Sequence, residues 1–354
     1  MEQRLLQLFP VERRSFWKQT ARVQEKVEEI RLRTGQPVLV KRQGQEWYLD
    51  DNGTFTDRPE RAYRVKAGEL EELLQHICHY SLYAFADEVR QGFLTVAGGH
   101  RVGIAGQVVL DGDGSVRTIK NVHYMNIRVA HQVKGAADRI LPYLYKGEDL
   151  KNTLIISPPG CGKTTLLRDL VRQISEGSGG HAGKCVGLVD ERSEIAGSYL
   201  GQPQNDVGSR TDVLDACPKA LGMMMLLRSM APEVVAVDEL GGEDDMKALR
   251  MAASCGCRIL ATIHGEDIRD VSEKLQSGNL LREGLFELFL VLSREGGKPV
   301  VKQIYGKEEA YAQMAGRDHD PVGKSGAGTL VSGTVSGQTK AASEIVRHPG
   351  DAHQ

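Results

Sequence analysis

Long hydrophobic runs are missing from this sequence, and their absence bears on membrane insertion. The longest uninterrupted apolar stretch, residues 220–227, has eight residues, whereas a helix that crosses a bilayer needs about 20. The N-terminal residues 1–14 contain no apolar segment followed by a small-residue cleavage site, so they lack the pattern of a secretory signal. We therefore expect neither export nor direct insertion into a membrane.

An excess of charge of one sign is also missing. The chain has 45 Lys and Arg residues against 47 Asp and Glu residues, which gives a formal net charge of −2. A protein whose main task is to neutralise nucleic-acid phosphates usually carries a clear positive excess. The balance of charges therefore argues against nucleic acid as a partner.

Clustered cysteines are missing too. The six cysteines are scattered along the chain, and Cys255 and Cys257 form a C-x-C pair. No second group of Cys or His residues follows this pair at the spacing of a zinc site. The interpretation that we favour is a set of reduced thiols in a cytoplasmic protein.

The pattern changes twice along the 354 residues, a length that suggests two domains and a tail. Residues 28–57 and 92–129 have strand patterns around turn signals, and helical stretches are expected at about 1–20 and 67–80, so we expect a small α+β domain over residues 1–135. Residues 136–306 are expected to form a second domain. Residues 307–354 are rich in Gly, Ser, Thr and Ala and lack apolar periodicity, which predicts a disordered tail.

The second domain has apolar strands that alternate with helices. Continuous apolar strands separated by helices indicate an α/β fold with a parallel sheet that is covered on both faces. The expected strands are Thr153–Ser157, Lys184–Asp190, Glu233–Glu239 and Cys257–His264. The expected helices between them are Lys163–Ser175, Pro218–Met230 and Glu243–Ser254.

A phosphate-loop pattern follows the first of these strands, with Ser157 in place of its first glycine. Gly160 and Gly162 let the backbone curl so that its N–H groups face one anion at the positive end of the next helix. Lys163 would reach the β- and γ-phosphates, and the Thr164 hydroxyl would coordinate Mg²⁺. The strand and helix that flank the loop disfavour a glycine-rich turn that binds nothing. The expected ATP-binding residues are Ser157, Pro158, Pro159, Gly160, Cys161, Gly162, Lys163, Thr164 and Thr165.

A phosphate loop needs a carboxylate at the end of a neighbouring strand, and Asp238-Glu239 follows the apolar residues 234–237. We expect Asp238 to hold Mg²⁺ and Glu239 to accept a proton from the attacking water. The alternative is that the acidic pair only begins a helix. An acidic pair rather than a lone Asp favours water as the nucleophile, and therefore hydrolysis rather than transfer to a small acceptor.

Three further residues are candidates for catalysis. His264 lies just past a strand, at the edge where α/β sheets bind ligands, and could hydrogen-bond the γ-phosphate or the water; the alternative is a core histidine. Glu191 could polarise water or orient Arg192, or lie in a solvated loop. Arg101, in a turn between two strands of the first domain, could be presented to the nucleotide of a neighbouring subunit, or belong to an ordinary hairpin.

Several segments of the sequence resemble the stage III sporulation protein AA family, and the resemblance extends over about residues 20–305. The family is similar to the secretion ATPases of type II and type IV systems, in which an N-terminal domain precedes a RecA-like motor. The resemblance implies a RecA-like P-loop NTPase core with a parallel sheet, preceded by a smaller α+β domain. The segments that carry it are Gly98–Gly106, Asn126–Gly135, Ser157–Asp169, Asp190–Gly197, Asp206–Gly241 and Ala261–Gly265.

The resemblance also implies a function. It implies an ATPase, a motor that hydrolyses ATP with Mg²⁺ and assembles as a homo-hexamer in the cytoplasm of the mother cell. The motor would lie peripherally at a membrane complex, and integral-membrane components of a channel between mother cell and forespore would be its partners. By the same likeness, Asp190–Arg192 resembles the acidic box of these motors and His264 resembles their histidine box.

Other functions of P-loop proteins remain as alternatives. The strongest is a nucleic-acid-associated RecA-like ATPase, but the near-neutral charge and the lack of a basic stripe with interleaved aromatics count against it. A small-molecule kinase would need a lid with its own arginines, and the sequence has no such insertion. A GTPase would usually carry an Asn/Thr-Lys-x-Asp motif, which does not occur.

Overall fold

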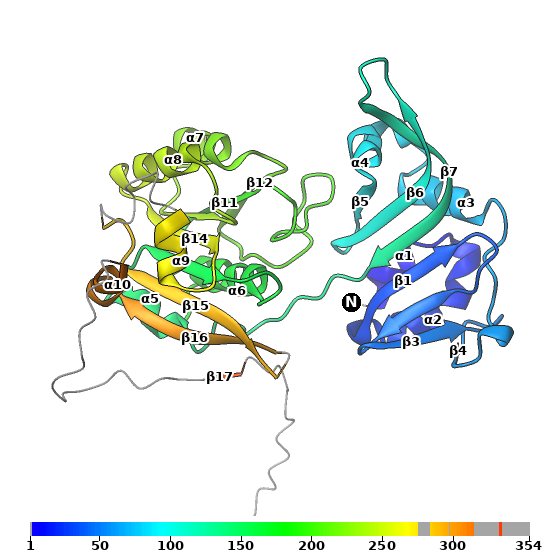
Figure 1. Ribbon diagram of the computed structural model, residues 1–354, viewed down its shortest axis with the longest axis horizontal. Helices are drawn as coiled ribbons and strands as arrows, with labels where there is room; N and C mark the ends of the chain where they lie inside the picture. The colour runs from blue at the N-terminus through cyan, green and yellow to red at the C-terminus, as the bar shows by residue number, and fades with distance from the viewer. Residues whose placement is uncertain (1, 275–283, 297, 315–332, 335–354) are drawn as a thin grey trace, which may run out of the picture.

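The computed structural model describes residues 2–274, 284–296, 298–314 and 333–334. Its strands form two large sheets and one two-stranded ribbon. Figure 1 shows the two large sheets in separate bodies, with the chain crossing from the first to the second after β7. Within the described ranges, no helix is both long and apolar enough to span a bilayer.

The first body is built on an antiparallel sheet with the order β4-β3-β2-β1-β7-β6-β5. Its core contains the stacked rings of Phe9 and Trp17, whose centroids lie 4.1 Å apart. The strands are β1 (Val27–Arg33), β2 (Leu39–Arg42), β3 (Gln45–Leu49), β4 (Phe55–Thr56), β5 (Phe93–Val96), β6 (His100–Leu110) and β7 (Val116–Arg128). The helices are α1 (Glu2–Gln7), α2 (Arg14–Arg22), α3 (Glu69–Ile77) and α4 (Ala86–Gln91), with 3-10 turns at Val11–Arg13, Gln24–Lys26, Pro59–Arg61 and Leu82–Phe85.

The second body is built on a sheet with the order β12-β11-β13-β14-β10-β15-β16-β17, which is parallel from β12 to β15. The two last strands are antiparallel to their neighbours. The strands are β10 (Thr153–Ser157), β11 (Val186–Asp190), β12 (Thr211–Asp215), β13 (Val234–Val237), β14 (Arg258–His264), β15 (Leu288–Glu295), β16 (Lys298–Gly306) and β17 (Gly333–Thr334). The helices are α5 (Leu141–Leu144), α6 (Lys163–Glu176), α7 (Lys219–Ser229), α8 (Glu243–Ser254), α9 (Ile268–Lys274) and α10 (Lys307–Met314), and the ribbon pairs β8 (Tyr145–Lys146) with β9 (Asp149–Leu150).

Helices cover both faces of the parallel sheet, which explains why its central strands are apolar at every position. One face packs against α7, α8, α9 and α10, and the other face packs against α5 and α6. In β10, β11 and β13 every residue is buried, so alternate side chains enter one or the other hydrophobic cluster. The prediction of an α/β fold with a parallel sheet, preceded by a smaller α+β unit, is confirmed.

The register of the parallel strands brings their carboxyl ends to one edge of the sheet. Ser157 at the end of β10 is aligned with His264 at the end of β14, and Val237 at the end of β13 is aligned with Ala261. Asp190 ends β11 on the same side. The segments that follow these strands therefore meet at the edge where α/β sheets bind ligands.

The prediction of a disordered tail is wrong for residues 307–314, because these residues form α10. Ala310 in this helix is fully buried, and the Tyr311 ring meets the Phe289 ring edge-on at 5.8 Å. The helix therefore packs against the end of the sheet. Apart from β17, the remainder of the predicted tail lies outside the described residues. The division at residues 135 and 136 stays a prediction.

Candidate functional site

The phosphate loop connects the end of β10 to the start of α6. Gly160 and Gly162 have φ angles of 72° and 82°, a left-handed conformation that glycine adopts without steric cost. Gly162 is also needed for space, because a Cβ atom there would lie 2.9 Å from the Cβ of Pro299. Ser157, the departure from the usual pattern, is buried and donates its hydroxyl hydrogen to the Pro158 carbonyl at 2.8 Å.

The N-terminus of α6 offers backbone N–H groups at this turn. Gly162 occupies the N-cap position and has no side chain that could accept from the first N–H groups of the helix. Free N–H groups and the positive end of the helix dipole favour an anion at this point. The loop therefore has the backbone geometry of a phosphate site.

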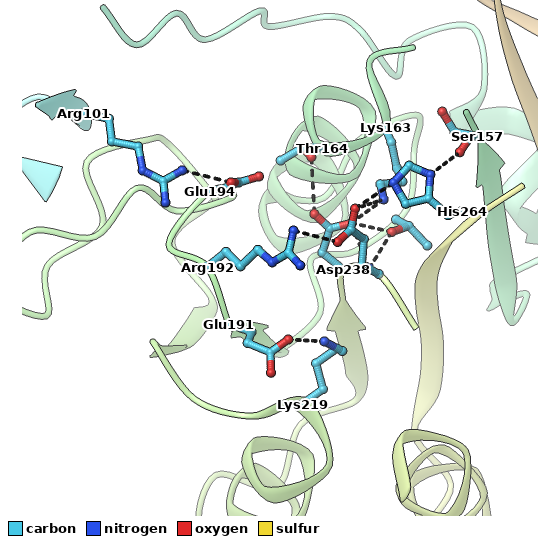
Figure 2. Close-up of polar contacts among 12 residues, drawn as sticks. Arg101, Ser157, Lys163, Thr164, Glu191, Arg192, Glu194, Lys219, Asp238 and His264 are labelled. Carbon is cyan, nitrogen blue, oxygen red and sulfur yellow. Dashed lines mark hydrogen bonds and ion pairs between the residues drawn. The ribbon is translucent and has the colours of Figure 1, made fainter. Parts of the chain in front are cut away.

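The lysine of the loop reaches the carboxylates that follow β13. Lys163 is 8% exposed, and its Nζ atom lies 2.9 Å from Glu239 Oε1 and 3.7 Å from Asp238 Oδ1. The Thr164 hydroxyl donates to Asp238 Oδ2 at 3.3 Å. Figure 2 shows the Lys163, Thr164 and Asp238 side chains pointing toward one another. A hydroxyl beside a carboxylate is a donor set that suits Mg²⁺, which is usually bound by one or two such groups together with phosphate and water.

Glu239 is the centre of the charge network, because three cationic or potentially cationic side chains meet its carboxylate. Besides Lys163, Arg192 Nη1 lies 3.1 Å from Oε2 and His264 Nε2 lies 3.1 Å from Oε1. Burial alone would raise the pKa of Glu239, but the Lys163 hydrogen bond and the charges of Lys163, Arg192 and His264 outweigh it and hold that pKa below its usual value. The network keeps the carboxylate ionised.

The backbone at Glu239 is in an unusual conformation. Its φ angle is 48°, a left-handed region that costs energy for a residue with a side chain. The Glu239 N–H donates to the Thr262 hydroxyl at 2.8 Å, and that hydroxyl donates in turn to Asp238 Oδ1. Thr262 is fully buried in β14, so it helps to fix the Glu239 backbone and the direction of the Asp238 carboxylate.

His264 connects two strands at the edge of the sheet. Its Nδ1 lies 3.2 Å from the Ser157 backbone carbonyl, while its Nε2 faces Glu239. The imidazole thus meets an acceptor at each nitrogen. Its side chain is 44% exposed, which rules out the alternative of a core histidine.

Two of the predicted catalytic residues lie outside this cluster. The Glu191 carboxylate is paired with the Lys219 ammonium and lies apart from Asp238 in Figure 2. Arg101 Nη1 lies 3.0 Å from Glu194 Oε1 of the same chain, and its guanidinium covers the Phe93 ring at 4.0 Å. The structure therefore joins Lys163, Asp238, Glu239 and His264 but not these two, whose catalytic roles stay predictions.

Sequence reasoning missed Arg192 and Thr262 as direct contacts of the carboxylates. Arg192 was expected at most to be oriented by Glu191, whereas its guanidinium contacts Glu239. Thr262 had one available signal, since it is the polar residue inside the otherwise apolar stretch 259–263.

An apolar pocket of about 170 Å³ lies beside the phosphate loop. Thr165, one of the predicted ATP-binding residues, faces it together with Cys161 and Gly162 of the loop. A flat, largely apolar group attached to a bound phosphate would fit against such a wall. The remaining lining residues are Val133, Ala136, Leu166, Leu292, Pro299, Val300 and Val301.

Comparison with known sequences gives one family. The family model described as "Sporulation stage III, protein AA" matches residues 1–311. Stage III sporulation protein AA of Bacillus subtilis (strain 168) is 44% identical over 282 residues, which covers 80% of this chain and 87% of that protein. Protein SEEDLING PLASTID DEVELOPMENT 1 of Arabidopsis thaliana is 30% identical over 149 residues, covering 42% of this chain and 21% of that protein.

Comparison with solved structures gives the fold. The pilus retraction motor PilT with bound ADP aligns with a TM-score of 0.57 and 14% identity, covering 85% of this chain and 86% of that chain. The ATPase DotB of Yersinia pseudotuberculosis aligns with a TM-score of 0.55 and 15% identity, covering 87% and 82%. At these identities the likeness shows the fold alone, which is that of the RecA-like secretion ATPases.

Proposed function

This chain belongs to the stage III sporulation protein AA family, and we propose that it is an ATP-hydrolysing motor of a sporulation-associated channel between mother cell and forespore. The observation that carries the proposal of hydrolysis is the 2.9 Å contact between Lys163 Nζ and Glu239 Oε1. This contact places a phosphate-loop lysine and an ionised carboxylate together at the positive end of α6. Hydrolysis of a phosphoanhydride by water needs a cation for the phosphates and a group that positions or deprotonates the water.

ATP would bind across the phosphate loop as the substrate. Residues 157–165 would hold its phosphates, and the apolar pocket beside Thr165 would take its base. Thr164 and Asp238 are placed to hold Mg²⁺, which when bound supplies positive charge to the phosphate oxygens. A Cβ atom at position 162 would collide with Pro299, so this turn of the loop requires glycine, as the phosphate-loop pattern does.

Glu239 would act as the general base. When Lys163 turns toward the phosphates, Oε1 of Glu239 loses one of its two partners, keeps His264 beside it and can take a proton from the attacking water, while Arg192 still holds Oε2. The low pKa of the carboxylate keeps it ionised at neutral pH, although a low pKa also makes it a weaker base. His264 would hydrogen-bond the γ-phosphate or the water, since its Nε2 already lies beside the same oxygen.

The assembly and the partners follow from the family rather than from the site. We expect a homo-hexamer in the mother-cell cytoplasm, held peripherally at a membrane complex whose integral-membrane components are its partners. The support is the 44% identity to a stage III sporulation protein over most of both chains. Neither nucleic acid nor direct membrane insertion is expected.

Phosphate release by the purified full chain tests the proposal. The parent protein should hydrolyse Mg-ATP, whereas Lys163→Ala should lose nucleotide binding and release no phosphate above background. A parent protein that binds no nucleotide would refute the ATPase assignment. Stimulation of hydrolysis by single-stranded DNA, rather than by a membrane partner, would favour the nucleic-acid-associated alternative.

A further inference from the structure

The loop between β11 and β12, residues 191–210, is held firmly against the second body. Asp190, which is 1% exposed, accepts three backbone N–H groups from residues 194–196 at 2.8 to 3.0 Å. Arg168 of α6 is also buried, and it donates to two carbonyls of the same segment at 2.5 and 2.6 Å. The helix that begins at the phosphate loop therefore fixes the path of this loop.

The same loop carries the contacts to the first body. Glu194 pairs with Arg101 at 3.0 Å, and the Tyr199 hydroxyl lies 2.6 Å from His79 Nε2. Farther along, the Gln204 side chain accepts a backbone N–H of the turn before β6 at 2.9 Å. A displacement of the first body would therefore also displace the β11–β12 loop or break these contacts.

Arg192 and Glu194 point from this loop in different directions. Ser193 between them has a φ angle of 52°, and its hydroxyl donates to Asp215 Oδ1 at 2.6 Å. From this anchored turn the Arg192 guanidinium contacts Glu239, whereas the Glu194 carboxylate contacts Arg101. Figure 2 shows the different directions of the Arg192 and Glu194 side chains. Two residues of one rigid turn thus contact the candidate base and the first body.

We propose that Arg192 is a positioning residue that orients the Glu239 carboxylate, and that the first body sets its position through Arg101 and Glu194. The role of Glu239 in hydrolysis rests on the function proposed above. Arg192 is 67% exposed, and exposed ion pairs contribute little to stability. Its effect is on geometry. Once Lys163 moves to the phosphates, Arg192 keeps Oε2 in place, so that Oε1, which still lies beside His264, faces the water.

Steady-state kinetics separate this role from a structural one. Arg192→Ala should lower kcat about tenfold and leave the KM for ATP within about twofold, because the interaction acts after binding. Arg192→Lys keeps a cation near Oε2 and should recover most of the rate. Arg117→Ala, which removes an exposed arginine of the β6–β7 hairpin, is the matched control and should behave as the parent. A parent-like kcat for Arg192→Ala overturns the proposal.

A double-mutant cycle tests the link to the first body. Arg101→Ala and Glu194→Gln should each lower kcat by about threefold to fivefold in the parent, and each effect should shrink below about twofold in the Arg192→Ala background. Glu194→Gln also distinguishes this link from an action of Arg101 on a neighbouring subunit, since it leaves Arg101 in place. Independent, multiplicative effects, or a parent-like rate for Glu194→Gln, overturn the link.

Hydrogen exchange of the nucleotide-free full chain gives a readout that needs no hydrolysis. Arg101→Ala should raise the exchange of backbone amides in residues 191–198 and also in 234–241 by about threefold, whereas Arg117→Ala should change neither segment. Faster exchange in 191–198 alone overturns the link to Glu239. Faster exchange in both segments, in a protein that hydrolyses no ATP, upholds the coupling and refutes the proposed function instead.

Discussion

At the scale of single residues, Thr262 holds the two carboxylate residues of the site in place. Its hydroxyl accepts the Glu239 N–H and donates to Asp238, and it does so from a fully buried position in β14. A left-handed backbone at a glutamate persists only where its surroundings impose it. The Thr262 hydroxyl is one of two groups that accept the Glu239 N–H, the other being Asp238 Oδ1, and both hold this backbone in place.

We expect Thr262→Val to destabilise the protein and slow hydrolysis. Valine has the same shape but removes the hydroxyl that accepts the Glu239 N–H and donates to Asp238, so that this N–H keeps only its 3.0 Å bond to Asp238 Oδ1. The loss should cost about 1–3 kcal/mol. Chemical denaturation measures the loss of stability, and a phosphate-release assay measures the rate. Thr262→Ser is the control that restores the hydroxyl. Equal stability of the valine and serine variants would contradict this role.

His100 makes the stability of the first body depend on pH. It is fully buried, its Nδ1 accepts the Ala130 N–H at 3.0 Å, and burial together with the charges of His131 and Arg4 lowers its pKa to about 4. Protonation therefore favours the unfolded chain, in which the pKa of histidine is about 6.5. Stability should be full above about pH 6.5 and fall by up to about 1.4 kcal/mol per pH unit toward pH 4.

Denaturation curves across this pH range check the prediction. His100→Asn cannot titrate and should remove much of the slope, whereas His123→Asn, at an exposed histidine of β7, should leave it unchanged. The same slope in the parent and in His100→Asn would show that other groups cause it.

Much of the candidate site could be predicted from the sequence, because its residues lie at the ends of apolar strands or shortly after them. Lys163, Asp238, Glu239 and His264 each occupy such a position, and parallel strands bring their ends together. Arg192 could not be placed in the same way. Its contact with Glu239 depends on the path of a loop, which local sequence patterns do not determine.

At the scale of elements, α10 is a helix that the sequence pattern did not predict. The helix has only eight residues, KEEAYAQM, and too few apolar positions for a helical period to stand out. Its stability comes from packing, since Ala310 is buried and Tyr311 meets Phe289. Short helices are held by tertiary contacts rather than by their own propensity.

Truncation at two points tests this account of α10. A chain that ends after Gly306 loses the helix and uncovers Phe289, so we expect a loss of about 2 kcal/mol or more and a lower melting temperature. A chain that ends after Met314 keeps the helix and serves as the control. Equal melting temperatures for the two truncated chains would show that α10 contributes nothing.

The sheets themselves were only partly predictable. The parallel strands β10, β11, β13 and β14 were expected from their apolar runs, whereas β12, with no fully buried residue, and the pairing of β1 with β7 were not. The pairing of β1 with β7 joins residues about 100 positions apart in the sequence. Such long-range pairing depends on the whole fold and leaves no local signal.

At the scale of the whole molecule, the two bodies meet at the loop that also contacts the candidate base. The Arg101–Glu194 pair and the His79–Tyr199 contact join the bodies. Residues 194 and 195 are bound to the phosphate-loop helix through Arg168. The proposed motor would have to couple hydrolysis to the movement of its parts. Among the described residues, the β11–β12 loop contacts both the candidate base and the first body, so it can couple hydrolysis to movement of the first body.

Glu239→Gln is the most direct test of the central claim that Glu239 is the base for ATP hydrolysis. Glutamine keeps the shape but cannot take a proton, and loss of a general base costs about 10²–10⁴-fold in rate. Titration of a fluorescent ATP analogue, alongside phosphate release, should show near-parent affinity with turnover reduced by that factor. Hydrolysis at the parent rate would contradict the account and make Glu191 the next residue to test.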